Sequence, residues 1–131
     1  MRYLTVPGAP PPPPSAKYSH AVEAGGLLFV TGQLPIDPKS PANPPPEGID
    51  AQTKLVFEIL RTICSASGYR LEDAAFVRIY LTNFARDYTA MNAVYSGIFS
   101  DDARLPGRTT VGVTTLGRDS LVEIDLVVGK P

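Results

Sequence analysis

An arginine that follows a Pro-Gly pair is the residue of this sequence best suited to hold an anion. Arg108 opens a run of β-branched residues, which predicts that the preceding loop passes directly into a strand. A guanidinium placed there projects from the end of a sheet, where its planar fork of donors suits a carboxylate. The alternative is a surface or interface arginine that pairs with an acidic side chain, and the spacing leaves both interpretations open.

Polar side chains on two other predicted elements could complete a site with this arginine. Residues 121–126 alternate strictly between apolar and acidic side chains, which predicts a strand whose second face carries Glu123 and Asp125. Those carboxylates are solvated, paired with cations or part of a pocket. Asn92 lies at the edge of the apolar stripe of a predicted helix, where a half-buried amide requires a hydrogen-bond partner from the core or from a ligand.

The chain has one histidine, His20, and one cysteine, Cys64. A zinc site with nitrogen and sulfur ligands therefore cannot be assembled within one chain, and we expect no metal and no cofactor. Cys64 falls in an apolar helical segment and is expected to be a small buried hydrophobe. No nucleophile motif lies near His20, so a structural or solvated histidine is favoured over a hydrolase triad.

Composition indicates one globular domain. The 131 residues are 44% hydrophobic and 19% charged, and the net charge of −1 is scattered along the chain. The absence of a basic run argues against a nucleic-acid partner. No apolar run approaches the roughly 18 residues of a membrane span, and the first residues do not form the apolar stretch of a secretory signal, so we expect a cytoplasmic protein with no membrane partner.

Periodicity predicts an α+β fold in the order ββαβαββ, with two helices on one face of a mixed sheet. In residues 49–67, apolar side chains recur every three or four positions, with Asp50 in the first turn and Gly68 as the C-terminal cap. The second helix, residues 86–99, buries Tyr88, Met91, Tyr95, Ile98 and Phe99. The strands are expected at residues 18–23, 27–31, 75–81, 109–114 and 121–128.

The same patterns give the sheet a second apolar face. In residues 75–81, three aliphatic side chains face the helices, and Phe76 and Tyr80 point to the other side. Residues 27–31 are apolar throughout, as expected for a strand covered on both faces. Because a monomer would leave this second face in water, the pattern predicts a homo-oligomer.

Two proline-rich segments interrupt these elements. Residues 7–14 predict an extended polyproline conformation, and we expect residues 1–16 to form an N-terminal arm ahead of a single domain at 17–131. A passive arm is favoured over a ligand for an SH3-type domain, because no basic residue flanks the prolines closely. Residues 35–46 contain too many prolines for a helix or strand and predict a long surface loop.

Six ordered motifs carry a resemblance to a known family. They are Tyr18-Ser19-His20-Ala21-Val22, Val30-Thr31-Gly32-Gln33-Leu34-Pro35, Ala51-Gln52-Thr53, Met91-Asn92-Ala93-Val94-Tyr95, Pro106-Gly107-Arg108-Thr109-Thr110-Val111 and Val122-Glu123-Ile124-Asp125. With these motifs, residues 18–128 resemble the Rid (YjgF-like) family of enamine/imine deaminases, small trimeric proteins of chorismate-mutase-like fold. The resemblance implies a homotrimer with pockets between its subunits.

The resemblance also implies roles for particular residues. The family's arginine, which holds the substrate carboxylate, matches Arg108, and its acid near the chain end matches Glu123. The remaining matched positions in the pocket are Tyr18, Thr31, Gly32 and Asn92. Of two departures, the first bears on activity, and the second, together with the longer loop at residues 40–46, bears on pocket closure and substrate size. Thr110 stands where well-known deaminases have cysteine, and Ala16-Lys17 replaces a Gly-Pro pair.

The implied reaction is the hydrolysis of a short-lived 2-imino or 2-aminoacrylate-type acid to a 2-keto acid and ammonia. An imine carbon is already electrophilic, so the reaction requires neither a metal nor a covalent nucleophile. Glu123 would activate a water, and Thr31, Thr110 or Tyr18 would hold that water or the nitrogen. Two alternatives remain: a trimer that binds small keto or amino acids without turnover, and a ribonuclease, which the missing basic patch disfavours.

Overall fold

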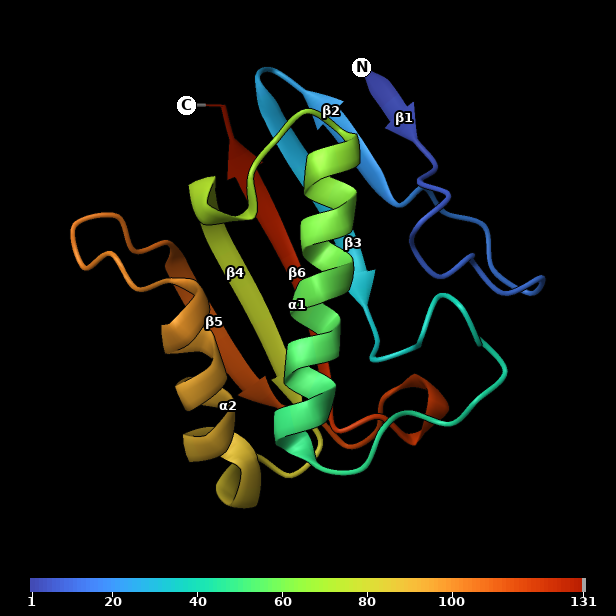
Figure 1. The fold of residues 1–131 in the computed structure, drawn as a ribbon, viewed down its shortest axis with the longest axis vertical. Coiled ribbons are helices and arrows are strands. Elements are labelled where there is room, and N and C mark those ends of the chain that lie inside the picture. Colours follow the sequence, from blue (N-terminus) through green and yellow to red (C-terminus); the bar gives the residue numbers. More distant parts are fainter. Residues whose placement is uncertain (131) are drawn as a thin grey trace.

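A six-stranded sheet with two helices on one side makes up the computed structural model, which describes residues 1–130 (Figure 1). The strands are β1 (Arg2–Leu4), β2 (Ala21–Ala24), β3 (Leu27–Gln33), β4 (Ala74–Leu81), β5 (Gly107–Gly112) and β6 (Val122–Gly129). The helices are α1 (Ile49–Ala66) and α2 (Phe84–Ile98), with short 3-10 turns at Leu71–Asp73 and Gly117–Asp119. The expected α+β architecture is confirmed, with one strand more than the sequence predicted.

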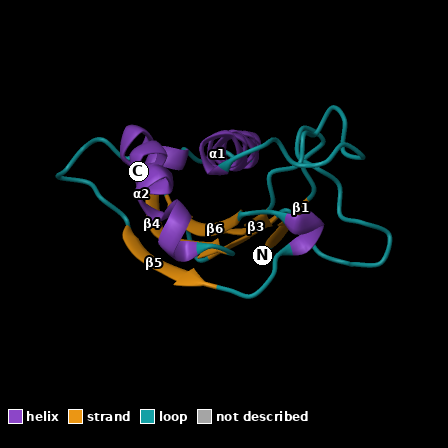
Figure 2. Cartoon of the chain, turned by 90° about the horizontal axis from the view of Figure 1, so that it is seen from below, coloured by secondary structure: helices purple, strands orange, loops and turns teal. Residues whose placement is uncertain are grey.

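The strand order is β1-β2-β3-β6-β4-β5, and β5 is therefore an edge strand. Neighbouring strands are antiparallel except β4 and β5, which run parallel because α2 connects them. Figure 2 shows both helices on the same side of this sheet. The opposite face carries no helix among the described residues. Within residues 1–130, no helix is both long and apolar enough to cross a membrane.

The core lies between the helices and the sheet, as the alternation of side chains predicts. Val77, Ile79 and Leu81 of β4 are fully buried beneath the helices. The predicted stripe of α1 is also buried, and the side chain of Cys64 in the same helix is 0% exposed. The helix ends where expected: Gly68 adopts a φ of 84°, and the Tyr69 amide donates to the Cys64 carbonyl at 2.9 Å.

The second helix differs from the prediction in its start and in its burial. It begins at Phe84 because the side chain of Asn83 accepts a hydrogen bond from the Arg86 amide and caps the helix. Tyr88 and Ile98, expected in the core, are only half-buried. Both lie toward the edge of the sheet, where fewer neighbours cover them.

Strand β1 is the element that the sequence did not predict. Residues 2–4 pair with residues 21–23 of β2, and Val6 and Ala9, which follow in the chain, are buried. The predicted strand at 18–23 correspondingly begins only at Ala21. The N-terminal residues are therefore packed against the sheet instead of extending away from it.

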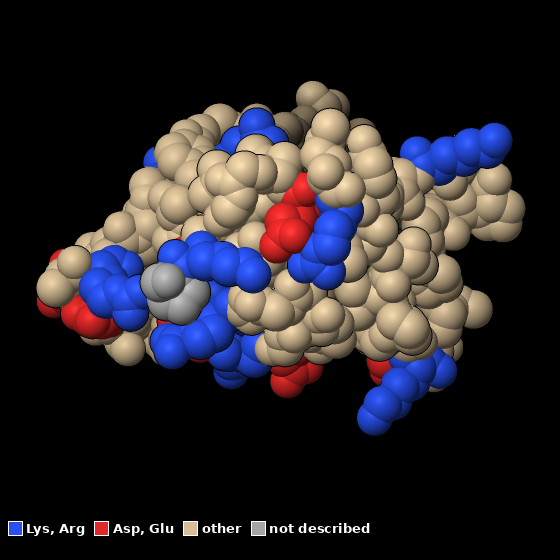
Figure 3. All heavy atoms as spheres, turned by 90° about the horizontal axis from the view of Figure 1, so that it is seen from above, with Lys and Arg blue, Asp and Glu red and all other residues tan. Residues whose placement is uncertain are grey.

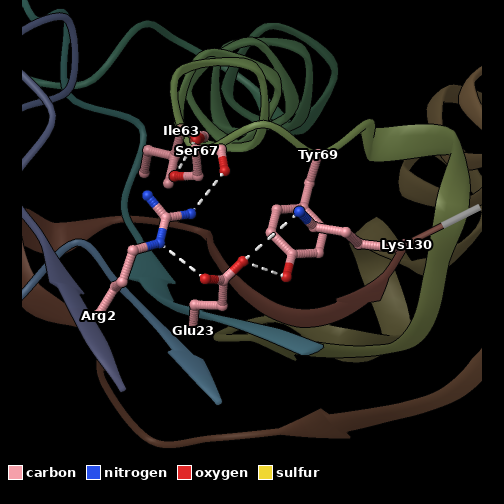
Figure 4. A network of polar contacts seen from close by, with 6 residues as sticks. All are labelled: Arg2, Glu23, Ile63, Ser67, Tyr69 and Lys130. Carbon is pink, nitrogen blue, oxygen red and sulfur yellow. Dashed lines mark hydrogen bonds and ion pairs between the residues drawn. The ribbon is translucent and has the colours of Figure 1, made fainter. Parts of the chain in front are cut away.

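A polar network fixes β1 to the rest of the fold (Figure 4). Glu23 accepts hydrogen bonds from Arg2 Nε at 2.7 Å and from Tyr69 Oη at 2.6 Å, and Lys130 Nζ lies 3.9 Å from the same carboxylate. Arg2 also donates to the Ser67 carbonyl at the end of α1. The hydrogen bonds from Arg2 and Tyr69 lower the pKa of Glu23 to about 2.

The face of the sheet without helices carries exposed apolar side chains from three strands. Phe29 is 45% exposed, and Leu27, Phe76 and Val111 are between 37% and 39% exposed. Within a single chain only the helix side of β3 is covered, so the predicted cover on the second face of residues 27–31 would have to come from another copy. A second protein surface would be needed to bury the open face.

Candidate functional site

Arg108 lies on the helix side of the edge strand β5. It pairs with Val77 of β4. Because paired residues of neighbouring strands point to the same face and Val77 points toward the helices, the Arg108 side chain also points toward them. The guanidinium carbon lies 4.6 Å from the ring centroid of Tyr95 and 5.7 Å from that of Tyr88, both on α2. The prediction that this side chain projects from the end of the sheet, away from any helix, is wrong, because the crossover helix packs over β5.

The guanidinium is oriented by neutral groups. Arg108 Nε donates to Thr110 Oγ1 at 2.9 Å, and one terminal nitrogen donates to Tyr88 Oη at 3.3 Å. Within residues 1–130, no carboxylate lies at ion-pairing distance from Arg108. The cation is therefore held in place while its charge remains available to an external anion.

Asn92 opens onto the same hollow as Arg108. This hollow of about 580 Å³ is bounded by α2, the loop after it and the start of β5, and Tyr88 and Tyr95 also line it. The Oδ1 atom of Asn92 is buried and has no hydrogen-bond partner among the described residues. A buried acceptor without a donor is costly, so this atom is suited to receive a hydrogen bond from a bound molecule.

Glu123 lies on the opposite face of the sheet. It pairs with Tyr80 of β4, and its neighbours Val122 and Ile124 point to the helices. Its carboxylate packs on the backbone of Gly32, where a Cβ atom would collide with Glu123 Oε2. An irregularity of β3 between Val30 and Gln33 brings this glycine beneath the carboxylate.

Burial and, secondarily, the charge of Asp125 raise the pKa of Glu123 above its ordinary value of 4.5. Burial and the charge of Glu123 likewise raise the pKa of Tyr18. Both side chains line a second hollow together with Thr31, whose hydroxyl donates to the Ser19 carbonyl at 2.6 Å. A carboxyl group with a raised pKa beside hydroxyl groups is suited to proton transfer.

The predicted site residues thus form two groups in one chain. Arg108, Thr110 and Asn92 lie on the helix side at the β5 edge, and Tyr18, Thr31, Gly32 and Glu123 lie on the open side near β3 and β6. The sheet itself separates the groups, so one chain does not bring them together.

Tyr88 and Tyr95, predicted only as core residues, also line this site. Their spacing around Asn92 was the available signal, because residues four before and three after an amide share its face of a helix. The structural interpretation of His20 is confirmed, since both of its ring nitrogens bind backbone groups. Among residues 1–130, no three His, Cys, Asp or Glu side chains cluster closely enough to hold a metal ion.

Comparison with known proteins identifies the family. The family model described as Endoribonuclease L-PSP matches residues 9–129. A RidA protein from an Antarctic Psychrobacter species has the same fold, with a TM-score of 0.88 and 30% sequence identity over 98% of this chain and 99% of that one. The chain belongs to the Rid (YjgF-like) family.

Three curated relatives of this Rid protein show the range of names in the family. A RutC family protein of Pyrococcus horikoshii is 39% identical over 91% of both chains. The 3-aminoacrylate deaminase RutC of Acinetobacter baylyi is 36% identical over 86% of both. A 2-iminobutanoate/2-iminopropanoate deaminase of Salmonella typhimurium is 29% identical over 84% of both. A general deaminase role of the Rid type is therefore supported.

Proposed function

We propose that this chain hydrolyses short enamine or imine acids to keto acids and ammonia, in pockets formed between copies of the chain. The observation that carries the proposal is the separation of two complementary half-sites onto opposite faces of one sheet. One half offers an oriented cation without a carboxylate partner, and the other offers a half-buried carboxyl group of raised pKa. Two relatives named as deaminases support the same reaction class.

A homotrimer would unite the halves. The open face carries Phe29, Phe76 and Val111, which are exposed in a single chain. These side chains would become less exposed if the open faces of three copies packed around a common axis. In such a ring, the β5 edge of one subunit lies beside β3 and β6 of the next. Each pocket would then combine Arg108 of one copy with Glu123 of its neighbour.

The chemistry follows from the groups in each half. Arg108 would bind the carboxylate of the substrate, and Asn92 Oδ1 would accept a hydrogen bond from its amino or imino nitrogen. Glu123 would take a proton from a water molecule as the water oxygen bonds to the imine carbon. That proton passes to nitrogen, which gives a carbon bearing one hydroxyl group and one amino group. Glu123 would then move the hydroxyl proton to the amino group as the C–N bond breaks, so that ammonia leaves and the C=O bond of the keto acid forms. Orientation of reactants and proton transfer together suffice for a substrate whose carbon is already electrophilic.

Both 2-imino acids and 3-aminoacrylate fit this scheme. Each has a carboxylate within one or two carbons of the reacting centre, and an enamine becomes an imine by moving one proton to carbon. A 2-imino acid yields a 2-keto acid, and 3-aminoacrylate yields the 3-oxo acid. We place 2-imino acids first, because a carboxylate held by Arg108 fixes a reacting carbon bonded directly to it more closely than one that is a further bond away.

A coupled assay tests the proposal. An amino-acid oxidase generates imines in situ, and keto-acid release is followed with and without the protein. Wild type should accelerate release, Arg108→Ala should abolish it, and Glu123→Gln should lower it by roughly 10²–10⁴-fold, the usual contribution of a placed base. Calorimetry with pyruvate should show that Glu123→Gln still binds the keto acid and Arg108→Ala does not. Binding by wild type without any acceleration would favour the non-catalytic binding protein.

The ribonuclease alternative receives less support from the charges of the surface. Figure 3 shows Lys and Arg side chains gathered near the C-terminus, with Asp and Glu side chains beside them. Cations paired with carboxylates include Arg2 and Lys130 with Glu23, Arg70 and Arg104 with Asp73, and Arg78 with Asp125. Cations that are already paired with carboxylates bind phosphates weakly, so this surface is poorly suited to RNA.

A further inference from the structure

The hollow that contains Glu123 is much larger than a three-carbon acid requires. Its volume is about 580 Å³, and most of its wall is apolar. Its lining includes Pro10–Pro14 together with Leu34, Ile36 and Pro41. Both proline-rich segments of the sequence therefore border the same hollow. The proposed reaction gives neither segment a role.

His20 fixes the first proline segment. Its Nδ1 accepts a hydrogen bond from the Val6 amide at 2.8 Å, which places the ring proton on Nε2, and Nε2 donates to the Pro10 carbonyl at 2.7 Å. The ring is 2% exposed. The backbone carbonyl of His20 also accepts from the Thr31 amide at 3.0 Å, so one residue connects the prolines to the strand beneath Glu123.

Arg118 fixes the second segment. Its two terminal nitrogens donate to the Pro41 carbonyl at 3.0 Å and to the Asn43 carbonyl at 2.7 Å. Arg118 adopts a φ of 61°, in the left-handed region that a non-glycine residue occupies only when its surroundings impose it. The side chain thus spans from the turn before β6 to the loop at 35–46 and holds that loop at the rim of the hollow.

We propose that these two segments form a preformed apolar pocket that makes the chain selective for imino acids with branched or aromatic side chains. This inference rests on the proposed function, since it places the reacting carbon beside Glu123 and the side chain between the prolines. Proline loses little conformational freedom on binding, so its rigid surface suits an apolar ligand group. A charged side chain would lose its hydration against the mostly apolar wall, and Arg118 is exposed at the rim, where water weakens any ion pair.

Binding of 2-keto acids tests the pocket without requiring turnover. Calorimetry would compare pyruvate, 4-methyl-2-oxopentanoate, phenylpyruvate and 2-oxoglutarate. Wild type should bind the branched and aromatic acids at least about tenfold more tightly than pyruvate, and should discriminate against the second carboxylate of 2-oxoglutarate. Equal affinity for all four acids would overturn the inference.

Two variants test whether the walls of the pocket cause the preference for branched and aromatic keto acids. Replacement of Pro11–Pro14 by Gly-Ser-Gly-Ser should remove the preference and leave pyruvate binding within about twofold of wild type, because the carboxylate contact is unchanged. Leu34→Phe should fill the hollow and weaken phenylpyruvate binding selectively. Pro44→Ser, in the same loop as Pro41 but outside the lining, is the matched control and should keep the preference. Retention of the preference in both wall variants would refute the pocket.

The coupled assay distinguishes failure of the apolar pocket from failure of the proposed deaminase function. Acceleration of every imine without a side-chain preference would overturn the pocket and leave the proposed function standing. A preference among keto acids without any acceleration would support the pocket and overturn the proposed deaminase.

Discussion

The carboxylate of Glu123 rests on the backbone of Gly32 so closely that no side chain fits between them. This contact fixes the proposed base over the irregular part of β3, and its burial there is the main cause of the raised pKa of the carboxyl group. The carboxylate of Glu123 is what requires a glycine at position 32. The backbone conformation of Gly32 itself is one that any residue can adopt.

Gly32→Ala should therefore displace the carboxylate. We expect imine hydrolysis to fall by roughly 10²-fold, near the lower limit of a base contribution, while pyruvate still binds to Arg108. Steady-state kinetics and calorimetry check the two effects. Gly97→Ala on α2 is the control, because a Cβ there meets no atom within 4 Å. Unchanged hydrolysis in Gly32→Ala would show that Glu123 does not act from its observed position.

Thr110 should act through Arg108. Thr110→Val keeps the shape of the side chain and removes the acceptor of the Arg108 Nε hydrogen bond. Because hydrogen bonds to charged groups contribute about 1.5–3 kcal/mol, KM should rise by roughly tenfold or more with a smaller change in kcat. Thr110→Ser should restore KM. A loss of kcat at constant KM would instead indicate that the hydroxyl takes part in the chemistry.

Mixed assemblies should recover activity from two inactive variants. If each pocket takes Arg108 from one copy and Glu123 from the next, trimers reassembled from equal amounts of Arg108→Ala and Glu123→Gln contain intact pockets. Random mixing makes about a quarter of all pockets intact, so about a quarter of wild-type activity should return. Native mass spectrometry would verify mixing. Fully mixed trimers without activity would show that both residues serve a pocket from the same chain.

The pH dependence of hydrolysis should reflect the environment of Glu123. The base must be deprotonated, so kcat/KM should rise with pH through the pKa of this residue, at a pH above the ordinary value of 4.5. Asp125→Asn removes a nearby negative charge that raises this pKa and leaves Arg78 without its partner. The acidic limb of the profile should move to lower pH in this variant. If the acidic limb stays at the same pH in Asp125→Asn, a group other than Glu123 causes that limb.

Glu23→Gln should lower the thermal stability at neutral pH by weakening the attachment of β1. The pKa of Glu23 is about 2 in the folded chain and 4.5 ordinarily, so the contribution is complete above pH 4.5 and is lost as the pH falls through 2. The difference in Tm between wild type and Glu23→Gln should therefore be widest near pH 7 and shrink between pH 4.5 and 2. Glu47→Gln, at an exposed loop residue, is the control. A difference that does not depend on pH would contradict the role of this charge.

Local periodicity was sufficient to predict the faces of the long elements. The alternation along residues 121–126 assigned Glu123 and Asp125 to the open face, and the spacing along α1 identified its buried stripe. These patterns succeed because each side chain's direction depends only on the conformation of its own segment. Most of the fold could therefore be predicted from single segments.

The relation between segments could not be predicted in the same way. The side of the sheet on which Arg108 lies depends on its register with Val77 of β4, and no local pattern in the mostly polar β5 indicates that register. Strand β1 has only three residues, too few for a period, and is held by contacts with Glu23. The division of the site into two halves follows from these non-local pairings.

The single thiol of the chain lies apart from both half-sites. Cys64 is fully buried in the core, and burial raises the pKa of its thiol to about 12, so the reactive thiolate is absent under physiological conditions. Peroxide and alkylating reagents that inactivate enzymes with accessible thiols find no target at this residue in the folded chain.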